Sequence, residues 1–280
     1  MMIILDGLKV KKKIIEELHN EVVNFVEKPN LVVIQVGNDE ASNIYIKQKE
    51  KMALGVGYGF KHLKFMEDIH EDELINEIEK LNNDKGVHAI LVQLPLPKHL
   101  NIMKVQNAIS PFKDVDGLSS INAGKLLHGE ECLVPCTPLG VMRLLAEYNI
   151  NVNGKNVVVI GRSNLVGKPM AILLDKAGAT VTLCHSKTKD LKEYTRLADI
   201  LVVAVGKPNM VMANMVSDNA IVIDVGINKV DDKICGDVCF EEVKDKVSYI
   251  TLVPGGVGPM TVAMLGVNVM RAYKMQRDRQ

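Results

Sequence analysis

The chain has 280 residues, 47% of them hydrophobic and 24% charged, which excludes a disordered protein and allows one large or two moderate domains. Because 34 Lys and Arg residues balance 34 Asp and Glu residues, no net field favours nucleic acid or an anionic membrane. The sequence contains neither an apolar run long enough to span a bilayer nor a secretory signal, and its five cysteines lack zinc-site or disulfide-framework spacing. We therefore expect a cytoplasmic protein with reduced thiols, no bound metal, and no nucleic-acid or membrane partner.

The first third of the chain alternates helical and strand patterns. In chain order they predict a helix over 8–26, a strand over 31–36, a helix over 42–54 capped by Ser42, a strand over 60–65, a helix over 72–81 and a strand over 87–94. This order predicts a parallel sheet covered by helices. The following stretch, from Pro111 to Pro138, is polar and weakly periodic, and it predicts a long functional loop that connects two domains.

The second half of the chain has the same alternation. Thr137 followed by Pro138 is typical of a helix start. Beyond that helix we predict strands over 156–160, 180–184, 200–205, 220–225 and 249–253, with helices over 168–177 and 190–197 and a last one over 259–273. The pattern favours an α/β protein of two domains: residues 1–136 plus 262–280, and residues 137–261 as a Rossmann-like doubly wound parallel sheet. The final helix is expected to return to the first domain.

A candidate nucleotide-binding turn follows the strand over 156–160. Gly161 permits a tight turn into a helix whose first backbone N–H groups can hold a pyrophosphate. The motif departs from G-x-G-x-x-G, because Ser163 stands at the second glycine position and Gly167 comes one place late. A purely structural turn would explain both glycines equally well.

The end of the next strand bears on the choice of cofactor. An NAD site usually carries an acid there to bind the ribose hydroxyls, but residues 184–188 contain none. Ser186 with Lys187 suits a 2′-phosphate instead, and the Arg162 guanidinium can reach the same group. The alternative is that residues 186–188 only cap the next helix. We predict NADP rather than NAD.

The first domain contains candidates for acid–base chemistry. Tyr45 and Lys49 are four residues apart on a predicted helix, so both lie on one face, although Lys49 also fits a solvated helix lysine. Gln93 is an amide near the end of an apolar strand, where a buried amide needs partners. Asp114 and Asp116 precede Gly117, either as turn residues or as a carboxylate held toward a polar ligand.

Seven motifs resemble those of the methylenetetrahydrofolate dehydrogenase–cyclohydrolase (FolD) family, in the same order along the whole chain. They are ASNIYIKQK (41–49), VQLPLP (92–97), KDVDG (113–117), PCTPLG (135–140), GRSNLVGKP (161–169), HSKT (185–188) and PGGVGPMT (254–261). Each is modest alone, but seven in this order are specific. The family also has G-R-S at the nucleotide turn, where this chain departs from the Rossmann pattern.

The resemblance implies a role for each matching residue. Lys49 would be the catalytic lysine, oriented by Gln93, while Tyr45 packs on the pterin ring and Asp116 binds its polar edge. The cofactor-binding positions would be Gly161, Arg162, Ser163, Ser186 and Ile227, and the folate-binding positions also include Pro254, Gly255, Gly256 and Val257. It further implies two α/β domains around a cleft and a homodimer joined through the cofactor domain.

The activity that the resemblance implies has two steps. NADP-dependent oxidation of 5,10-methylenetetrahydrofolate needs the methylene carbon held against the nicotinamide, and hydrolysis of the methenyl product to 10-formyltetrahydrofolate needs a proton relay, which a tuned lysine can provide. The alternatives are a monofunctional methylenetetrahydrofolate dehydrogenase, a two-domain amino- or hydroxy-acid dehydrogenase, and a non-enzymatic sensor. A dehydrogenase that acts on amino or hydroxy acids would give no reason for Tyr45, Lys49, Gln93 and Asp116 to occur together.

Overall fold

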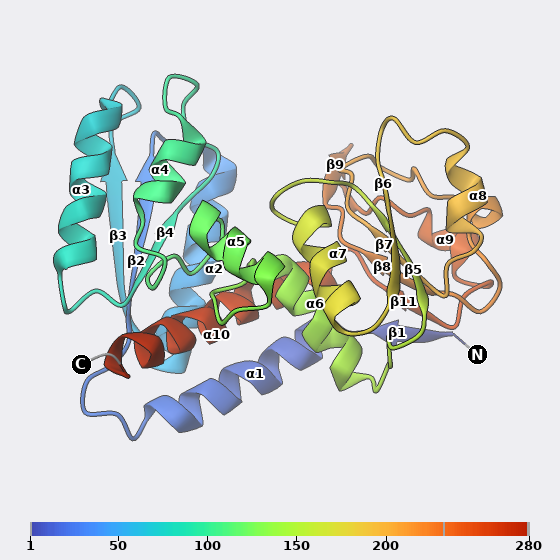
Figure 1. The fold of residues 1–280 in the computed structure, drawn as a ribbon, viewed down its shortest axis with the longest axis horizontal. Helices are drawn as coiled ribbons and strands as arrows, with labels where there is room; N and C mark the ends of the chain where they lie inside the picture. Colours follow the sequence, from blue (N-terminus) through green and yellow to red (C-terminus); the bar gives the residue numbers. More distant parts are fainter. Residues whose placement is uncertain (1, 232, 279–280) are drawn as a thin grey trace. The chain divides into compact units, whose positions relative to one another are not determined.

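The structure is a computed structural model that describes residues 2–231 and 233–278 (Figure 1). The chain divides into two compact units. We call Lys13–Cys136 with Val262–Gln280 the three-stranded unit, and Met1–Lys12 with Thr137–Thr261 the six-stranded unit. Within the described residues, no helix is long and apolar enough to cross a membrane.

The three-stranded unit contains a parallel sheet in the order β3-β2-β4. Its strands are β2 (Asn30–Val36), β3 (Gly59–Phe65) and β4 (Ala89–Val92). The central strand β2 is buried from Leu31 onward on both faces, as expected of a parallel sheet covered on two sides. The sequence prediction of three parallel strands is therefore confirmed, with β4 shorter than predicted at both ends.

Helices α2 (Glu40–Val56), α3 (Glu71–Asn83), α4 (Ile102–Ala108) and α5 (Ser120–His128) accompany this sheet (Figure 1). The cap of α2 differs from the prediction: Asp39 is the N-cap and accepts the backbone N–H of Ser42 at 2.7 Å. The Ser42 hydroxyl is buried and donates to the same carboxylate. The predicted long loop is also wrong in part, since α5 forms within it, with Ser119 as N-cap.

The core on one side of this sheet joins alternate strand residues to α3 and α4. Its buried members include Val32, Ile34 and Ile90 from the strands, and Leu74 and Ile78 from α3. Burying each such side chain contributes about 1.5–3 kcal/mol. Apolar residues recur every two positions in the strands and about every 3.6 positions in α3, so each element has an apolar face. These faces pack against each other in this layer.

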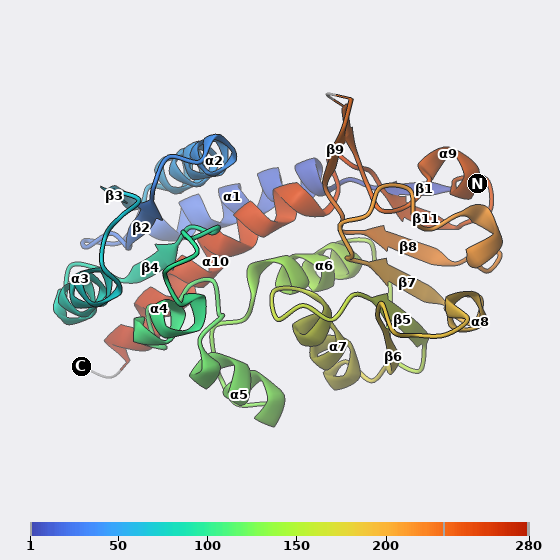
Figure 2. The ribbon, with the colours of Figure 1, turned by 90° about the horizontal axis from the view of Figure 1, so that it is seen from above.

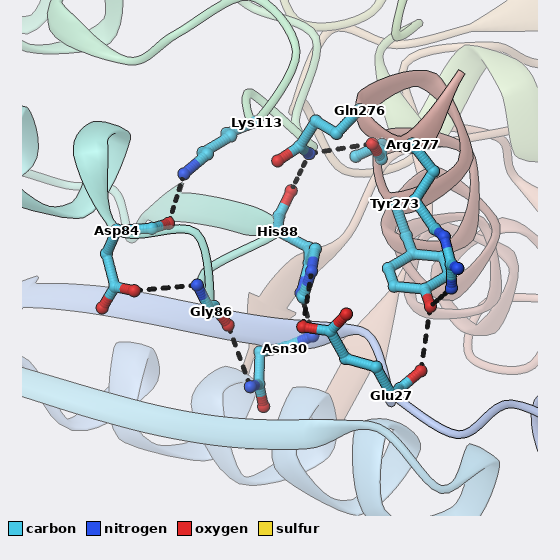
Figure 3. Close-up of polar contacts among 10 residues, drawn as sticks. Glu27, Asn30, Asp84, Gly86, His88, Lys113, Tyr273, Gln276 and Arg277 are labelled. Carbon is cyan, nitrogen blue, oxygen red and sulfur yellow. Dashed lines mark hydrogen bonds and ion pairs between the residues drawn. The ribbon is translucent and has the colours of Figure 1, made fainter. Parts of the chain in front are cut away.

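Polar contacts attach the last turns of α10 (Val257–Arg277) to the three-stranded unit (Figure 3). The Gln276 amide donates to the backbone carbonyls of His88 at 2.8 Å and Phe112 at 3.1 Å. The Tyr273 hydroxyl donates to the carbonyl of Glu27 at 3.0 Å, and its ring meets the edge of the His88 ring. The final helix therefore returns to the first domain, as predicted.

The six-stranded unit is built on a parallel sheet in the order β1-β11-β8-β7-β5-β6, and Figure 2 shows this succession of strands. The strands are β1 (Ile3–Leu5), β5 (Asn156–Ile160), β6 (Thr180–Cys184), β7 (Ile200–Val203), β8 (Ile221–Asp224) and β11 (Tyr249–Thr251). The sheet order reverses direction at β5, as in a doubly wound fold, so the predicted fold class is confirmed.

Strand β1 corrects the predicted boundary, which placed residues 1–12 with the first domain. Ile3 pairs with Tyr249 and Leu5 with Thr251, so β1 extends the six-stranded sheet beside β11. A strand of three residues is too short for its periodicity to reveal a partner more than 240 positions away. The helix α1 (Gly7–Val22) begins in this unit directly after the strand.

The remaining elements of the six-stranded unit include one that was not predicted, the antiparallel hairpin of β9 (Asn228–Val230) and β10 (Lys233–Cys235), which projects from the unit in Figure 2. The helices are α6 (Cys136–Glu147), α7 (Gly167–Lys176), α8 (Leu191–Thr195) and α9 (Phe240–Val243), with a 3₁₀ turn at Ala213–Met215. Thr137 lies inside α6, and its hydroxyl is hydrogen-bonded to that of Thr261 at 2.9 Å. It is therefore not the helix cap that the sequence suggested.

Candidate active site

The ammonium group of Lys49 and the amide of Gln93 meet in the three-stranded unit. Lys49 lies on α2 and donates from Nζ to Oε1 of Gln93 at 2.8 Å. Gln93 follows β4 and is 8% exposed. Its backbone N–H donates to Ile34 and its side-chain amide donates to Leu94, at 2.8 and 2.6 Å. Because both of these donors are engaged, the side-chain oxygen of Gln93 is held toward Lys49.

Burial shifts the protonation equilibria of Lys49 and Asp116 in opposite directions. Desolvation lowers the pKa of Lys49, while the attraction of Asp116 opposes the shift. Desolvation likewise raises the pKa of Asp116, with help from Asp114 and against the attraction of Lys49. Each group thus moves toward its neutral form, and each stabilises the charged form of the other. Such a pair suits proton transfer, because desolvation brings the charged and neutral forms of each group closer in free energy.

The segment that carries Asp116 is anchored on both sides of it. Buried Lys113 donates from Nζ to three carbonyls at the end of α3, and Figure 3 shows one of them, that of Asp84. The three acceptors are Leu81 at 3.0 Å, Asn82 at 2.8 Å and Asp84 at 2.8 Å. Asp114 accepts the N–H of Ser119 at 2.8 Å. Asp114 is therefore a turn residue that caps this segment, whereas Asp116 interacts with Lys49.

Cys136 and Asn268 lie beside this cluster, and neither was predicted from the sequence as a site residue. Asn268 of α10 is fully buried, and its amide donates to the carbonyls of Val115 and Val134, each at 2.8 Å. It thereby ties the segment before Asp116 to the segment before Cys136. Burial raises the pKa of the Cys136 thiol well above its usual value, and this thiol donates to the carbonyl of Val115 at 3.4 Å. The available signal was an asparagine within the apolar run of a helix.

Tyr45 lies one turn before Lys49 on α2, so both side chains leave the same face of the helix. It is 43% exposed, and its ring can therefore receive a planar ligand. The structure thus brings Lys49, Gln93 and Asp116 into one electrostatic cluster and sets Tyr45 on the same helix face as Lys49.

The nucleotide turn after β5 depends on two glycines. Gly161 has φ +115°, and a Cβ there would lie 2.1 Å from the carbonyl oxygen of Ala204. A Cβ at Gly167, the first residue of α7, would lie 1.8 Å from the carbonyl oxygen of Gly161. Packing alone therefore requires both glycines, which agrees with the alternative that the turn is purely structural. The turn still leaves Arg162 and Ser163 exposed at the start of a helix, the arrangement that a phosphate-binding site needs.

The turn after β6 exposes Ser186. The backbone N–H of His185 donates to Thr188 Oγ1 at 2.9 Å, and that of Lys187 donates to the His185 ring at 3.2 Å. The N-cap of α8 is Asp190, which makes no side-chain capping bond. Residues 186–188 thus close their own turn, and the alternative that they cap the next helix is wrong.

The segment Pro254–Val257 lies against the start of α1 within the six-stranded unit. The carbonyl of Gly255 accepts the N–H groups of Gly7 and Leu8 at 3.0 and 3.2 Å. Gly255 has φ +114°, a conformation that glycine adopts readily. Ile227, 49% exposed, lies beside this segment, because a Cβ at Gly258 would be 3.4 Å from its terminal methyl. Among the described residues, no three His, Cys, Asp or Glu side chains are placed to hold a metal ion.

Comparisons with known proteins place this geometry in a class. A family model described as the catalytic domain of tetrahydrofolate dehydrogenase/cyclohydrolase matches residues 5–116. A second, described as the NAD(P)-binding domain of the same family, matches residues 135–277. Together the two matches span most of the sequence. The chain belongs to the tetrahydrofolate dehydrogenase/cyclohydrolase family.

Individual relatives agree with the family models over the full length. The bifunctional protein FolD of Hydrogenobaculum sp. is 50% identical over 277 residues, which cover 98% of this chain and 100% of the relative. The crystal structure of FolD from Campylobacter jejuni, a methylenetetrahydrofolate dehydrogenase/cyclohydrolase, is 48% identical with a TM-score of 0.97 and covers 99% of this chain and 100% of that one. The Trypanosoma brucei enzyme, complexed with NADP cofactor and inhibitor, is 36% identical with a TM-score of 0.94 and covers 99% and 98%.

Proposed function

We propose that Lys49, Gln93 and Asp116 form the catalytic centre of a bifunctional folate enzyme. The chain is a methylenetetrahydrofolate dehydrogenase and methenyltetrahydrofolate cyclohydrolase that uses NADP. It oxidises 5,10-methylenetetrahydrofolate and hydrolyses the methenyl product to 10-formyltetrahydrofolate, two reactions of one-carbon metabolism. The observation that carries the catalytic proposal is the 2.8 Å contact of Lys49 Nζ with Gln93, at a lysine whose pKa is lowered by burial.

The hydrolytic step needs a group that removes a proton from water as it attacks the methenyl carbon. A neutral amine can do this, and the lowered pKa of Lys49 increases the neutral fraction at a given pH. Gln93 accepts a hydrogen bond from the amine and so orients its lone pair or its remaining protons. The ammonium form that results is stabilised by the carboxylate of Asp116.

Asp116 and Tyr45 are proposed to bind the pterin. A carboxylate accepts hydrogen bonds from the N–H groups along the polar edge of this ring system, and an exposed tyrosine ring offers an apolar face for it. Pro254, Gly255, Gly256 and Val257 are proposed as further folate-binding residues, on the basis of their family motif. The open backbone of a two-glycine segment permits close approach of a ligand.

The proposed NADP site consists of residues at the ends of the parallel strands. Gly161 and Ser163 would hold the pyrophosphate at the start of α7, while Arg162 and Ser186, both exposed, would bind the 2′-phosphate. Ile227 would provide an apolar contact. When bound, NADP accepts the hydride that the methylene carbon loses. The residues of the chain orient the two molecules for this transfer and need no metal to do so.

The organisation of the protein follows from the same proposal. We assign folate chemistry to residues 1–136 with 262–280 and cofactor binding to residues 137–261. Strand β1 is the exception, because it pairs with the six-stranded sheet. We also propose a homodimer joined through the cofactor domain and a cytoplasmic location. Sedimentation of the purified protein tests the dimer, since a monomer at micromolar concentration would contradict it.

The decisive experiment is turnover of 5,10-methylenetetrahydrofolate with NADP and with NAD in parallel, together with hydrolysis of the methenyl compound. We expect reduction of NADP in preference to NAD and hydrolysis by the same preparation. Oxidation without hydrolysis would favour the alternative of a monofunctional dehydrogenase. Binding without turnover would favour a sensor.

A further inference from the structure

Two buried acidic residues of the six-stranded unit take no part in the chemistry proposed above. Asp224 ends β8 and is 4% exposed, while Asp237 follows the β9–β10 hairpin and is completely buried. Buried carboxylates are costly unless hydrogen bonds satisfy them. The partners of these two residues therefore indicate why the fold retains them.

The carboxylate of Asp237 joins two segments that follow neighbouring strands. One oxygen accepts the backbone N–H groups of Val205 and Gly206 at 2.7 and 3.0 Å. The other accepts the N–H of Lys207 at 2.8 Å and the side-chain amide of Asn228 at 2.9 Å. A single side chain thus fixes residues 205–207, after β7, to residue 228, after β8.

The carboxylate of Asp224 fixes the backbone around Asp237. Its oxygens accept the N–H groups of Gly226 at 3.1 Å, Asp237 at 3.0 Å and Val238 at 2.9 Å. The two carboxylates are therefore linked in series, from β8 through residue 237 to residues 205–207. This arrangement holds three chain segments with seven hydrogen bonds.

Two glycines make room for these carboxylates. A Cβ at Gly226 would lie 2.1 Å from the carboxyl carbon of Asp237, and a Cβ at Gly236 would lie 1.8 Å from an oxygen of Asp224. A side chain at either position would displace the acid. The glycines are thus part of the same network, because they let a carboxylate lie directly on the backbone.

The network lies at the edge of the sheet where cofactors bind. In doubly wound sheets the ligand crevice opens at the carboxyl ends of the strands, and segments 205–207 and 225–228 follow two such ends. Ala204, the residue before the first segment, packs against Gly161 of the nucleotide turn. Ile227, proposed above to contact NADP, lies between Gly226 and Asn228, which the two carboxylates hold.

We propose that Asp237 and Asp224 are positioning residues of the NADP site, which hold segments 205–207 and 226–228 in the arrangement that binds the cofactor. This inference rests on the proposed function. An ionised carboxylate suits the task, because it accepts four hydrogen bonds and donates none. An asparagine at position 237 would present an NH₂ group to at least one backbone donor, so the segments would shift apart.

The first test is Asp237→Asn, which keeps the volume of the side chain. We expect its KM for NADP and its Kd in a direct NADP titration to rise about tenfold, the effect of losing one or two hydrogen bonds. The KM for methylenetetrahydrofolate and the rate of methenyl hydrolysis without NADP should stay within about twofold. Asp245→Asn, at an exposed position of the same unit, is the matched control and should leave all four values unchanged.

The outcomes separate this inference from the proposed function. An Asp237→Asn variant with the NADP affinity of the unmutated protein would overturn the positioning role, while the enzyme assignment would stand. If unmutated protein failed to turn over with NADP, the proposed function itself would fail. If Asp237→Asn does not fold, Gly226→Ala displaces the same carboxylate without removing its charge. Unchanged NADP affinity in that variant would equally overturn the inference.

A pH profile tests the contribution of Asp224. Burial raises its pKa to about 6, assisted by the facing charge of Asp237 and opposed by the hydrogen bonds from Val238, Asp237 and Gly226. Protonation below that pH weakens the carboxylate as an acceptor, so NADP affinity should fall from pH 7 to pH 5 more steeply in the unmutated protein than in Asp224→Asn. The 2′-phosphate also titrates near pH 6, but equally in both proteins. Parallel profiles would overturn the role of Asp224.

Discussion

The two proposed sites of this chain place their polar side chains in opposite environments. In the three-stranded unit, Gln93 is buried and Lys49 and Asp116 are half-buried, and desolvation shifts the pKa of the lysine down and that of the acid up. In the six-stranded unit, Arg162 and Ser186 are exposed at the ends of strands. Proton transfer requires groups whose charged and neutral forms are close in free energy, and desolvation brings this about. Anion binding requires donors and a permanent cation that a ligand can reach.

This contrast predicts how each region responds to mutation. Removal of a desolvated titratable group abolishes a chemical step, whereas removal of an exposed cation weakens one contact. The acids Asp224 and Asp237 form an intermediate case, since they are buried and are proposed to act through the backbone of the cofactor site.

Substitution of the lysine should give the largest effect. Lys49→Gln keeps the length and polarity of the side chain but removes the titratable amine, so cyclohydrolase activity should fall by about 10²–10⁴-fold. Dehydrogenase activity should persist in part, because hydride transfer depends chiefly on orientation. The methenyl product should then accumulate, which its near-ultraviolet absorbance would reveal. Lys47→Gln, on an exposed position of α2, is the control. Hydrolysis at the unmutated rate would make Lys49 an ordinary helix lysine.

The pH dependence of hydrolysis should report the same group. Because burial lowers the pKa of Lys49 from its usual value of 10.5, its neutral form becomes available at lower pH than in a solvated lysine. Cyclohydrolase activity should therefore rise with pH, by up to about tenfold per unit below that pKa, and level off before pH 10.5. The rising limb should vanish in Lys49→Gln. A limb that survives the substitution would belong to another group.

Substitutions of the neighbouring acids Asp114 and Asp116 should affect different properties of the protein. Asp116→Ala should weaken folate binding by about 10–100-fold and depress both activities, while NADP affinity and the folding midpoint stay nearly unchanged. Asp114→Ala should instead lower the free energy of unfolding by about 1–3 kcal/mol, because it leaves the N–H of Ser119 unpaired. Calorimetric titration of each ligand and thermal unfolding measure these quantities. Normal folate binding by Asp116→Ala would show that Asp116, like Asp114, is only a turn residue.

Substitution of the exposed cation of the proposed cofactor site should have a similar or smaller effect, confined to one cofactor. Arg162→Ala should raise the KM for NADP by the equivalent of about 1.5–3 kcal/mol, the contribution of a charge-assisted hydrogen bond. The KM for NAD, which lacks the 2′-phosphate, should change little. Steady-state assays with both cofactors measure the difference. Equal loss with NADP and NAD would mean that Arg162 does not contact the 2′-phosphate.

A structural hydrogen bond between neutral groups should give the smallest effect. The Tyr58 hydroxyl donates to the carbonyl of Gly266 in α10 at 2.9 Å, and the ring is buried. Tyr58→Phe should lower the free energy of unfolding by about 0.5–1.5 kcal/mol without changing either KM. Urea unfolding would measure this loss of stability, provided that the m-value stays the same in both proteins. A changed KM for folate would show that this contact also supports the site.

Local patterns were sufficient for much of the fold and for part of the site. The strands near 31–36 and 156–160 were predicted because each has a continuous apolar run followed by a glycine, and the turn at Gly161 was predicted from the same residues. Lys49, Gln93 and Asp116 were chosen from their residue types, their positions on predicted elements and the family motifs. The resemblance implied that Gln93 orients Lys49, and the structure shows the contact itself, between a helix and a strand end 44 positions apart.

The tertiary structure decided which polar residues are buried and what satisfies them. Asn268 ties together the carbonyls of Val115 and Val134, more than 130 positions away, and Asp237 fixes backbone groups about 30 positions away. Asn268 is marked in the sequence only by its place in the apolar run of a helix, and Asp237 has no local pattern that distinguishes it from a surface aspartate. The reason is physical: an isolated polar side chain has the same hydration wherever it stands in the sequence, and its free energy changes only when distant segments exclude water and present donors to it.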